Sequence, residues 1–180
     1  MAHFPQKILL LGSTGSIGTS ALNCIRRYRE RFRVTGLAAG RNHKLLQKQI
    51  CEFRPEAVYI ADPLEAERLQ NEFDRIRVYS GSEGLVELVK QTKCDIVLNA
   101  LVGAIGFRPT VTALQCNRRV ALANKESLVM GGDYICQLLS GGKGKLLPVD
   151  SEHSAILQCL NGAESSTVES IILTASGGPF

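Results

Sequence analysis

The chain has 180 residues, of which 44% are hydrophobic and 21% are charged, and its formal net charge is +4. This composition is typical of a folded globular protein and excludes a mainly disordered chain. No apolar run reaches the roughly 18 residues that a membrane-spanning helix needs, and the N-terminus has no signal-peptide pattern, so we expect a cytoplasmic protein without a membrane partner.

The charge and the cysteines argue against two further classes. The positive charge is too small and too dispersed to predict a nucleic-acid partner, and the five arginines between residues 26 and 33 are expected to solvate the end of a helix. The six cysteines are far apart, with no Cys-x-x-Cys pair, and the chain has only three histidines. Neither a zinc site nor a disulfide framework is indicated, and we expect the thiols to be buried and reduced.

Strand-like apolar runs alternate with helix-like segments along most of the chain. Residues 8–11 and 96–98 are continuously apolar, as parallel strands covered on both faces require. The expected strands are residues 7–11, 33–39, 57–60, 75–79, 95–99, 119–123 and 145–149. The expected helices are residues 16–30, 43–53, 62–72, 82–91, 104–116 and 126–139. Repeated β-α units of this length predict an α/β fold with a doubly wound, mostly parallel, Rossmann-like sheet.

The first expected strand runs into three glycines, Gly12, Gly15 and Gly18, at the start of the first helix. Glycines allow a sharp turn and the close approach of a pyrophosphate, and a helix N-terminus offers free N–H groups to an anion. The spacing differs from the commoner Gly-x-Gly-x-x-Gly. The turn predicts a nucleotide site; the alternative is a tight strand-to-helix turn that binds nothing.

The end of the second expected strand indicates which nucleotide binds. NAD sites carry an acidic residue about 20 positions after the glycine turn, where it holds the ribose 2′-hydroxyl. This chain has Gly40, Arg41 and Asn42 there, and the planar guanidinium of Arg41 can pair with a 2′-phosphate. The pattern favours NADP over NAD. The alternative is an exposed arginine at the start of a helix that Asn42 caps.

Asn124, Lys125 and Glu126 follow the sixth expected strand, at the sheet edge where ligands of open α/β sheets bind. Their side chains are suited to hydrogen-bond a cofactor or a polyol phosphate, with Lys125 as the cation. The alternative is an ordinary helix start in which Glu126 lies near the positive end of the helix dipole. The residue types alone do not decide between the two.

Asp150 and Glu152 follow the last expected strand of the sheet. Oxygen ligands of this kind suit a hard cation such as Mg²⁺ or Mn²⁺, which needs further oxygens to complete its coordination. The alternative is helix capping by Asp150 or Ser151.

The character of the sequence changes after residue 149. A polar cluster opens a further helix, a strand is expected near residues 167–173, and the sequence ends at Phe180. A loop of this kind normally leads to residues that cover the strand. We therefore expect a nucleotide-binding domain at 1–149 and, at 150–180, the beginning of an α+β catalytic domain that is truncated here.

Six motifs, in the expected order along the whole chain, resemble those of the 1-deoxy-D-xylulose 5-phosphate reductoisomerase family. That family converts 1-deoxy-D-xylulose 5-phosphate to 2-C-methyl-D-erythritol 4-phosphate, with NADPH and a divalent metal, in non-mevalonate isoprenoid biosynthesis. The motifs are residues 12–18, 40–42, 100–106, 122–129, 148–154 and 174–180.

The resemblance implies a role for each residue that matches a motif. The NADPH contacts it implies are Thr14, Gly15, Ser16, Ile17, Gly40, Arg41, Asn42, Asn124 and Glu126. The implied ligands of Mg²⁺ or Mn²⁺ are Asp150 and Glu152, and the implied contacts with the sugar-phosphate substrate are Lys125, Ser151, Glu152 and Ser176. Lys125, Asp150 and Glu152 would then be the catalytic residues. Arg41 stands where many relatives have lysine, which keeps the positive charge.

The resemblance also indicates what this sequence lacks. A third metal carboxylate, a mobile active-site loop and a C-terminal helical domain of the family would follow Phe180. We expect the chain alone to be an incomplete, inactive fragment and the full-length protein to be a homodimer. Two alternatives stay open: another NADP-dependent oxidoreductase, such as a homoserine or aspartate-semialdehyde dehydrogenase, and a non-catalytic nucleotide-binding module.

Overall fold

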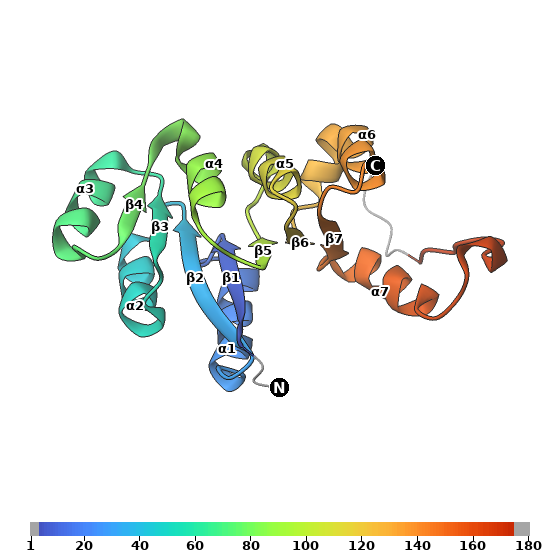
Figure 1. Ribbon diagram of the computed structural model, residues 1–180, viewed down its shortest axis with the longest axis horizontal. Coiled ribbons are helices and arrows are strands. Elements are labelled where there is room, and N and C mark those ends of the chain that lie inside the picture. Colours follow the sequence, from blue (N-terminus) through green and yellow to red (C-terminus); the bar gives the residue numbers. More distant parts are fainter. Residues whose placement is uncertain (1–3, 175–180) are drawn as a thin grey trace.

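A computed structural model describes residues 4–174, which form an α/β domain followed by a projecting C-terminal segment (Figure 1). The strands are β1 (Gln6–Leu11), β2 (Phe32–Ala39), β3 (Ala57–Ile60), β4 (Arg77–Tyr79), β5 (Ile96–Asn99), β6 (Arg119–Leu122) and β7 (Lys145–Pro148). The α-helices are α1 (Ser16–Arg27), α2 (His43–Phe53), α3 (Pro63–Glu72), α4 (Gly81–Gln91), α5 (Phe107–Gln115), α6 (Glu126–Ser140) and α7 (Ser151–Leu160). Two short 3₁₀ helices are η1 (Ala104–Gly106) and η2 (Ser165–Thr167).

The seven strands form one sheet in the order β4-β3-β2-β1-β5-β6-β7, and every neighbouring pair is parallel. The chain begins at the centre with β1, builds outward to β4, and then returns to β5 on the other side of β1. Leu11, the last residue of β1, pairs with Ala38 of β2 and with Asn99 of β5. The strand order therefore reverses between β1 and β5, and such a switch point is where open α/β sheets bind ligands.

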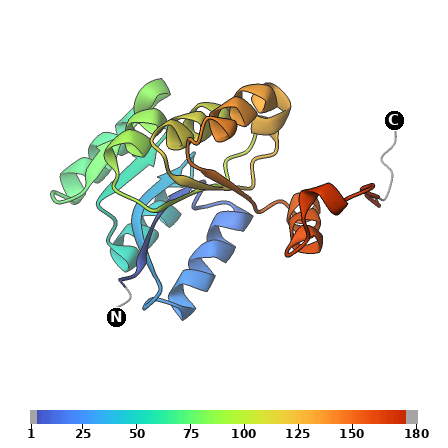
Figure 2. The same ribbon diagram turned by 45° about the vertical axis from the view of Figure 1, so that its right-hand side comes forward.

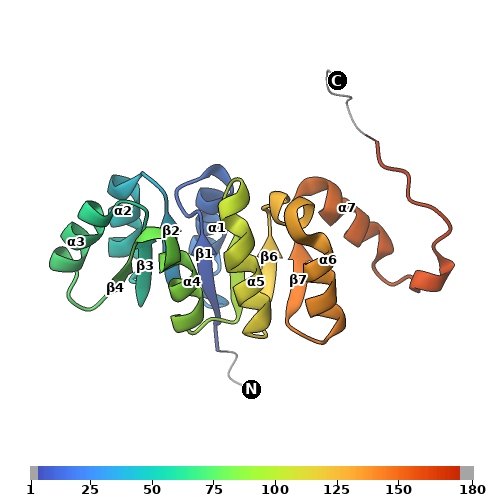
Figure 3. The same ribbon diagram turned by 90° about the horizontal axis from the view of Figure 1, so that it is seen from above.

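Both faces of the sheet are buried, which explains the continuously apolar strands. Side chains alternate along a strand, so Leu9 and Leu11 lie in one core cluster with residues of α4, α5 and α6. Ile8 and Leu10 lie in the other cluster, with residues of α1, α2 and α3. Figure 3 shows α4 and α5 on one side of the sheet and α1 and α2 on the other. The doubly wound, Rossmann-like sheet predicted from sequence is confirmed, and it is parallel throughout.

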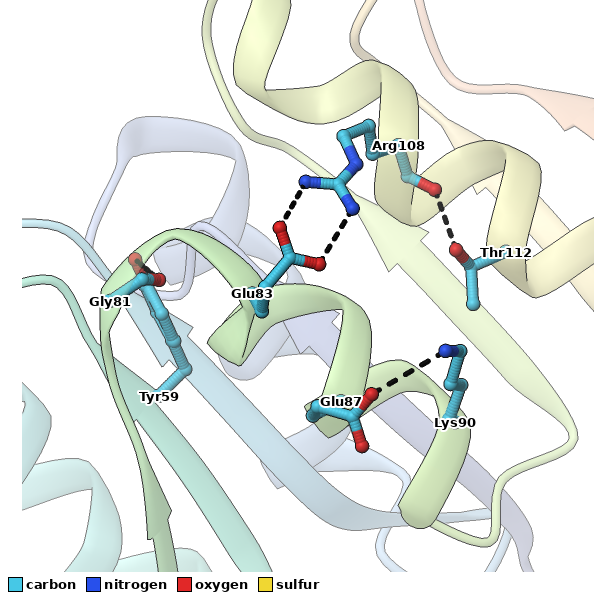
Figure 4. Close-up of polar contacts among 7 residues, drawn as sticks. All are labelled: Tyr59, Gly81, Glu83, Glu87, Lys90, Arg108 and Thr112. Carbon is cyan, nitrogen blue, oxygen red and sulfur yellow. Dashed lines mark hydrogen bonds and ion pairs between the residues drawn. The ribbon is translucent and has the colours of Figure 1, made fainter.

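An ion pair joins the helices α4 and α5 on the solvent side of this layer (Figure 4). Both terminal nitrogens of Arg108 donate to the carboxylate of Glu83, each at 2.6 Å. Thr112 donates its hydroxyl to the carbonyl oxygen of Arg108 at 2.8 Å, which satisfies the hydroxyl within its own helix. A two-pronged pair of this kind fixes orientation as well as distance.

Three expectations need correction. The strand expected near residues 167–173 is absent: within the described part of the chain, residues 168–174 have no regular structure, and Ile172 is 89% exposed. An apolar run becomes a strand only beside a hydrogen-bonded neighbour, and none of the described strands pairs with it. The first helix ends at Arg27 rather than at residue 30. The cysteines are free as expected, but five of the six are exposed and only Cys94 is partly buried.

The C-terminal part has a different character from the sheet domain. Helix α7 has no buried residue and packs on β7, and Figure 2 shows it projecting with the following residues from the β7 end of the sheet. Across residues 4–174, no helix combines the length and apolarity needed to span a bilayer.

Candidate nucleotide and metal site

The turn after β1 closes too tightly for any residue other than glycine at two positions. Gly12 has φ +84°, and a Cβ atom there would lie 2.5 Å from the carbonyl oxygen of Ala100. A Cβ atom at Gly18 would lie 2.2 Å from the carbonyl oxygen of Gly12. The backbone N–H groups of Gly12 and Ser13 both donate to the carbonyl of Ala38, at 2.9 and 2.8 Å. The turn is thereby attached to the end of β2.

The N-terminus of α1 is open. Gly15 is the N-cap residue, and no described side chain caps the first turn, which also contains no acidic residue. Gly15, Ser16 and Ile17 are exposed, and Thr14 is partly buried. The first N–H groups of a helix have no partner within it, so they are available to an anion here. The residues present therefore fit the pyrophosphate of a dinucleotide.

The start of α2 brings an arginine to the same edge of the sheet. Gly40, Arg41 and Asn42 are exposed, and the Oδ1 atom of Asn42 accepts a hydrogen bond from the backbone N–H of Leu45 at 3.1 Å. The helix capping considered as an alternative is therefore present, but the side chain that caps is Asn42 and not Arg41. Arg41 forms no ion pair with any residue from 4 to 174. Its guanidinium is available to a phosphate.

The Asn124 side chain is buried, with only 1% of its surface exposed, and it joins two segments of the chain. Its amide nitrogen donates to the carbonyls of Leu101 and Gly103, at 2.9 and 3.0 Å, and to Glu126 at 3.1 Å. Its Oδ1 atom accepts from the N–H of Ser127 at 3.1 Å and from the Ser127 hydroxyl. The side chain therefore ties the loop after β5 to the start of α6.

Lys125 and His153 both contact Asp150. The ammonium of Lys125 lies 2.9 Å from Oδ2 of Asp150, and Nδ1 of His153 lies 3.1 Å from Oδ1. The hydrogen bond from Lys125 is the main cause that lowers the pKa of Asp150 from 3.8 to about 2, and the same contact raises the pKa of Lys125. Asp150 is therefore an ionised carboxylate at neutral pH.

Asp150 stands at the N-cap position of α7, but its side chain makes no capping hydrogen bond. Capping by this side chain is therefore not supported. Glu152 lies in the first turn of α7, and its Oε2 atom accepts a hydrogen bond from the Ser151 hydroxyl at 2.6 Å. Asp150, Ser151 and Glu152 all offer oxygen atoms that can ligate a metal, and they follow the carboxyl end of β7.

The donor set suits a hard divalent cation. Mg²⁺ is commonly held by one or two carboxylates, with waters and substrate oxygens completing an octahedral shell. Asp150 and Glu152 fit that pattern, although residues 4–174 contain no cluster of three or more His, Cys, Asp or Glu side chains able to hold a metal. Ser176, the remaining predicted substrate contact, lies outside the described residues.

A groove of about 280 Å³ adjoins this cluster. Lys125, Asp150 and His153 line it together with apolar side chains of β6, α6, β7 and α7, among them Leu128 of α6 and Leu157 of α7. The charged cluster thus lies against an apolar wall.

Sequence reasoning missed two of these contacts. The Ser13 hydroxyl donates to Oε1 of Gln49 at 2.7 Å, and the Gln49 amide donates back to the Ser13 carbonyl at 2.9 Å. The other is the contact of His153 with Asp150. A signal for the first did exist: Gln49 interrupts the apolar face that Leu46 and Ile50 form on α2, and a polar residue on a buried face needs a partner.

The all-parallel sheet, the reversal of strand order at β1 and the open glycine turn define an α/β protein of the Rossmann-like class. A family model described as 1-deoxy-D-xylulose 5-phosphate reductoisomerase matches residues 8–132, and the model of that enzyme's C-terminal domain matches residues 146–180. The chain belongs to the 1-deoxy-D-xylulose 5-phosphate reductoisomerase family. This membership favours the reductoisomerase over the other dehydrogenases considered from sequence.

Similar proteins support the assignment. The chain is 50% identical over 177 residues to the 1-deoxy-D-xylulose 5-phosphate reductoisomerase of Rhodococcus jostii, covering 98% of this chain and 43% of the relative. It is 51% identical to that of Mycolicibacterium smegmatis, covering 97% and 42%. A crystal structure of DOX-P reductoisomerase in complex with NADPH, fosmidomycin and magnesium matches with a TM-score of 0.82 and 37% identity, covering 88% of this chain and 40% of that one. The chain thus spans less than half the length of these relatives.

Proposed function

We propose that this chain is the NADPH-binding part of an enzyme that converts 1-deoxy-D-xylulose 5-phosphate to 2-C-methyl-D-erythritol 4-phosphate, in non-mevalonate isoprenoid biosynthesis. The observation that carries the proposal is the arrangement of three features at the carboxyl ends of the strands. These are the open glycine turn, the exposed Arg41, which has no ion pair among residues 4–174, and the Lys125–Asp150 pair next to Glu152. Family membership supplies the reaction.

The cofactor half of the site follows from the free N–H groups and the positive charge. The first turn of α1, at Gly15, Ser16 and Ile17, binds the pyrophosphate, with Thr14 beside it. Gly40, Arg41 and Asn42 hold the adenosine end, where the guanidinium of Arg41 pairs with the 2′-phosphate. Asn124 holds the loop at residues 101–103 in place, and it reaches the cofactor through its backbone because its side chain is occupied. Glu126, partly buried beside it, is the remaining contact.

The substrate half of the site lies at the ends of β6 and β7. Bound NADPH supplies the hydride, and a bound Mg²⁺ or Mn²⁺ supplies Lewis acidity toward the carbonyl oxygen. Asp150 and Glu152 hold the cation through their carboxylate oxygens. Lys125 and Ser151 orient the oxygens of the sugar phosphate, with Ser176 as a further contact. The apolar wall of the groove, to which α7 contributes, helps to keep water away from the reacting atoms.

We propose residues 1–149 as the NADPH-binding domain and 150–180 as the beginning of the catalytic domain, because β7 completes the sheet and α7 leaves it. Because the chain spans less than half of its relatives, we assign the activity to a protein of the family's full length, a cytoplasmic homodimer without nucleic-acid or membrane partners. The 180-residue chain should bind NADPH without turning over substrate.

The test compares the 180-residue chain with a family-length protein that contains it. NADPH oxidation is followed after addition of 1-deoxy-D-xylulose 5-phosphate and Mn²⁺, with homoserine plus NADP⁺ as the control reaction. We expect turnover only from the longer protein, only with the sugar phosphate, and its loss with chelator. Turnover of homoserine instead, or none with the sugar phosphate, would refute the proposed activity.

A further inference from the structure

Gln49 and Ser13 form a buried pair of reciprocal hydrogen bonds. Gln49 is 3% exposed and Ser13 is fully buried. One bond runs from the Ser13 hydroxyl to the Gln49 amide oxygen, and the other runs from the Gln49 amide nitrogen to the Ser13 carbonyl. Both hydrogen-bonding ends of the amide are therefore used on a single residue of the glycine turn.

The pair joins two parts of the candidate cofactor site that are far apart in sequence. Ser13 lies in the turn that leads to the open N-terminus of α1. Gln49 lies about two turns along α2, whose first turn follows Arg41. The N–H groups of Gly12 and Ser13 also share the carbonyl of Ala38, at the end of β2. The turn is thus held from both β2 and α2, the two elements that flank Arg41.

Core packing alone does not account for a glutamine at this place. Its neighbours on the buried face of α2, Leu46 and Ile50, are apolar, and an apolar side chain there would require no partner. A buried amide is costly unless every group is hydrogen-bonded, and hydrogen bonds impose a distance and a direction that apolar contacts do not. The pair therefore fixes how far the turn stands from the start of α2.

The distance between the glycine turn and Arg41 determines whether one dinucleotide can contact both. In an NADP-type dinucleotide, the pyrophosphate and the 2′-phosphate are attached to the same ribose, so the distance between the two anionic groups varies little. A protein binds both at full strength only if its two anion sites are held at the matching separation before the ligand arrives.

We propose that Gln49 is a positioning residue for cofactor selection, which holds the glycine turn at the separation from Arg41 that a 2′-phosphorylated dinucleotide requires. This inference rests on the proposed NADPH binding. Gln49 acts through Ser13 and does not touch the cofactor. Its loss should weaken NADPH binding more than NADH binding, because NADH does not use Arg41.

The test measures the affinities of the 180-residue chain for NADPH and NADH by calorimetry. Gln49→Met keeps the length of the side chain and removes both hydrogen bonds. Gln47→Met is the matched control on the same helix, since the Gln47 amide contacts Glu72 on α3 instead of the turn. We expect Gln49→Met to lower the ratio of NADPH to NADH affinity about fivefold, a change of the size of the net contribution of a single hydrogen bond, and Gln47→Met to leave it unchanged.

A double-mutant cycle with Arg41→Ala separates positioning from simple destabilisation. In the Arg41→Ala background, Gln49→Met should change NADPH affinity little, because the contact through which it acts is already gone. Equal losses in both backgrounds, or an unchanged affinity ratio in Gln49→Met, would overturn the proposal. If Gln49→Met does not fold, Ser13→Ala, which removes one of the two bonds, should show a smaller shift in the same direction, and no shift would overturn it. A wild-type chain with no preference for NADPH would instead refute the proposed cofactor.

Discussion

The ammonium of Lys125 lies 2.9 Å from Oδ2 of Asp150. A positively charged side chain thus contacts one oxygen atom of the carboxylate that we propose as a metal ligand. A divalent cation that binds Asp150 through this oxygen would compete with Lys125 for it, and a released ammonium would be free to contact an anionic substrate. The contact therefore links the metal half of the site to the substrate half.

Removing the Lys125 ammonium should increase the affinity of the site for a divalent cation. In Lys125→Met, the Oδ2 atom of Asp150 loses the ammonium that competes with a cation, and we expect Mn²⁺ to bind the chain severalfold more tightly. Electron paramagnetic resonance of free Mn²⁺ measures this directly, without reference to turnover. Lys145→Met, on β7 and outside the described ion pairs, is the control. Unchanged or weaker Mn²⁺ binding in Lys125→Met would show that Asp150 and Glu152 do not form the cation site.

The lowered pKa of Asp150 predicts a dependence of stability on pH. Its folded-state pKa, about 2, lies below its ordinary value of 3.8. The charged form is therefore favoured by folding, and its contribution is present above pH 3.8 and is lost as the pH falls towards 2. Urea unfolding should show the wild-type chain more stable than Asp150→Asn at neutral pH, with the difference disappearing near pH 2. A constant difference across that range would mean that the carboxylate's charge contributes nothing.

Asn124 should prove important for folding as well as for the site. Asn124→Ala removes a buried side chain that donates to the carbonyls of Leu101 and Gly103, and leaves these partly buried acceptors without that donor. We expect a loss of about 2–3 kcal/mol in the free energy of unfolding, the usual effect of unsatisfied buried polar groups. Urea denaturation at neutral pH measures it. Val129→Ala, in the helix α6 that follows Asn124 and at a side chain that is 86% exposed, should cost little. Equal losses in the two variants would show that Asn124 does not hold the loop in place.

The sheet could be predicted because its signals are local. The apolar run at residues 8–11 and the glycines that follow identify a buried strand, a turn and a helix without reference to any other segment. The Ser13–Gln49 pair and the bonds of Asn124 could not be predicted in this way, because each joins segments that only the folded chain brings together. For the same reason the strand expected near residues 167–173 was wrong: its apolar residues have no neighbouring strand among the described residues with which to pair. The exposed cysteines show that low polarity does not by itself bury a residue on an amphipathic helix.

Arg41 decides the choice of cofactor in our proposal, and its effect can be measured alone. It is exposed, and the neighbouring cap is formed by Asn42, so Arg41→Ala should leave the helix α2 intact. We expect NADPH affinity to fall about tenfold or more, the scale of a lost charge-assisted contact, while NADH affinity stays nearly constant. Calorimetry with both cofactors measures this, and Lys48→Ala, an exposed cation further along α2, controls for a general loss of positive charge. If both arginine and lysine variants lose NADPH affinity equally, the effect is one of overall charge and not of a guanidinium held at the 2′-phosphate. Equal affinity of the unmutated chain for NADPH and NADH would remove the basis of the NADP assignment.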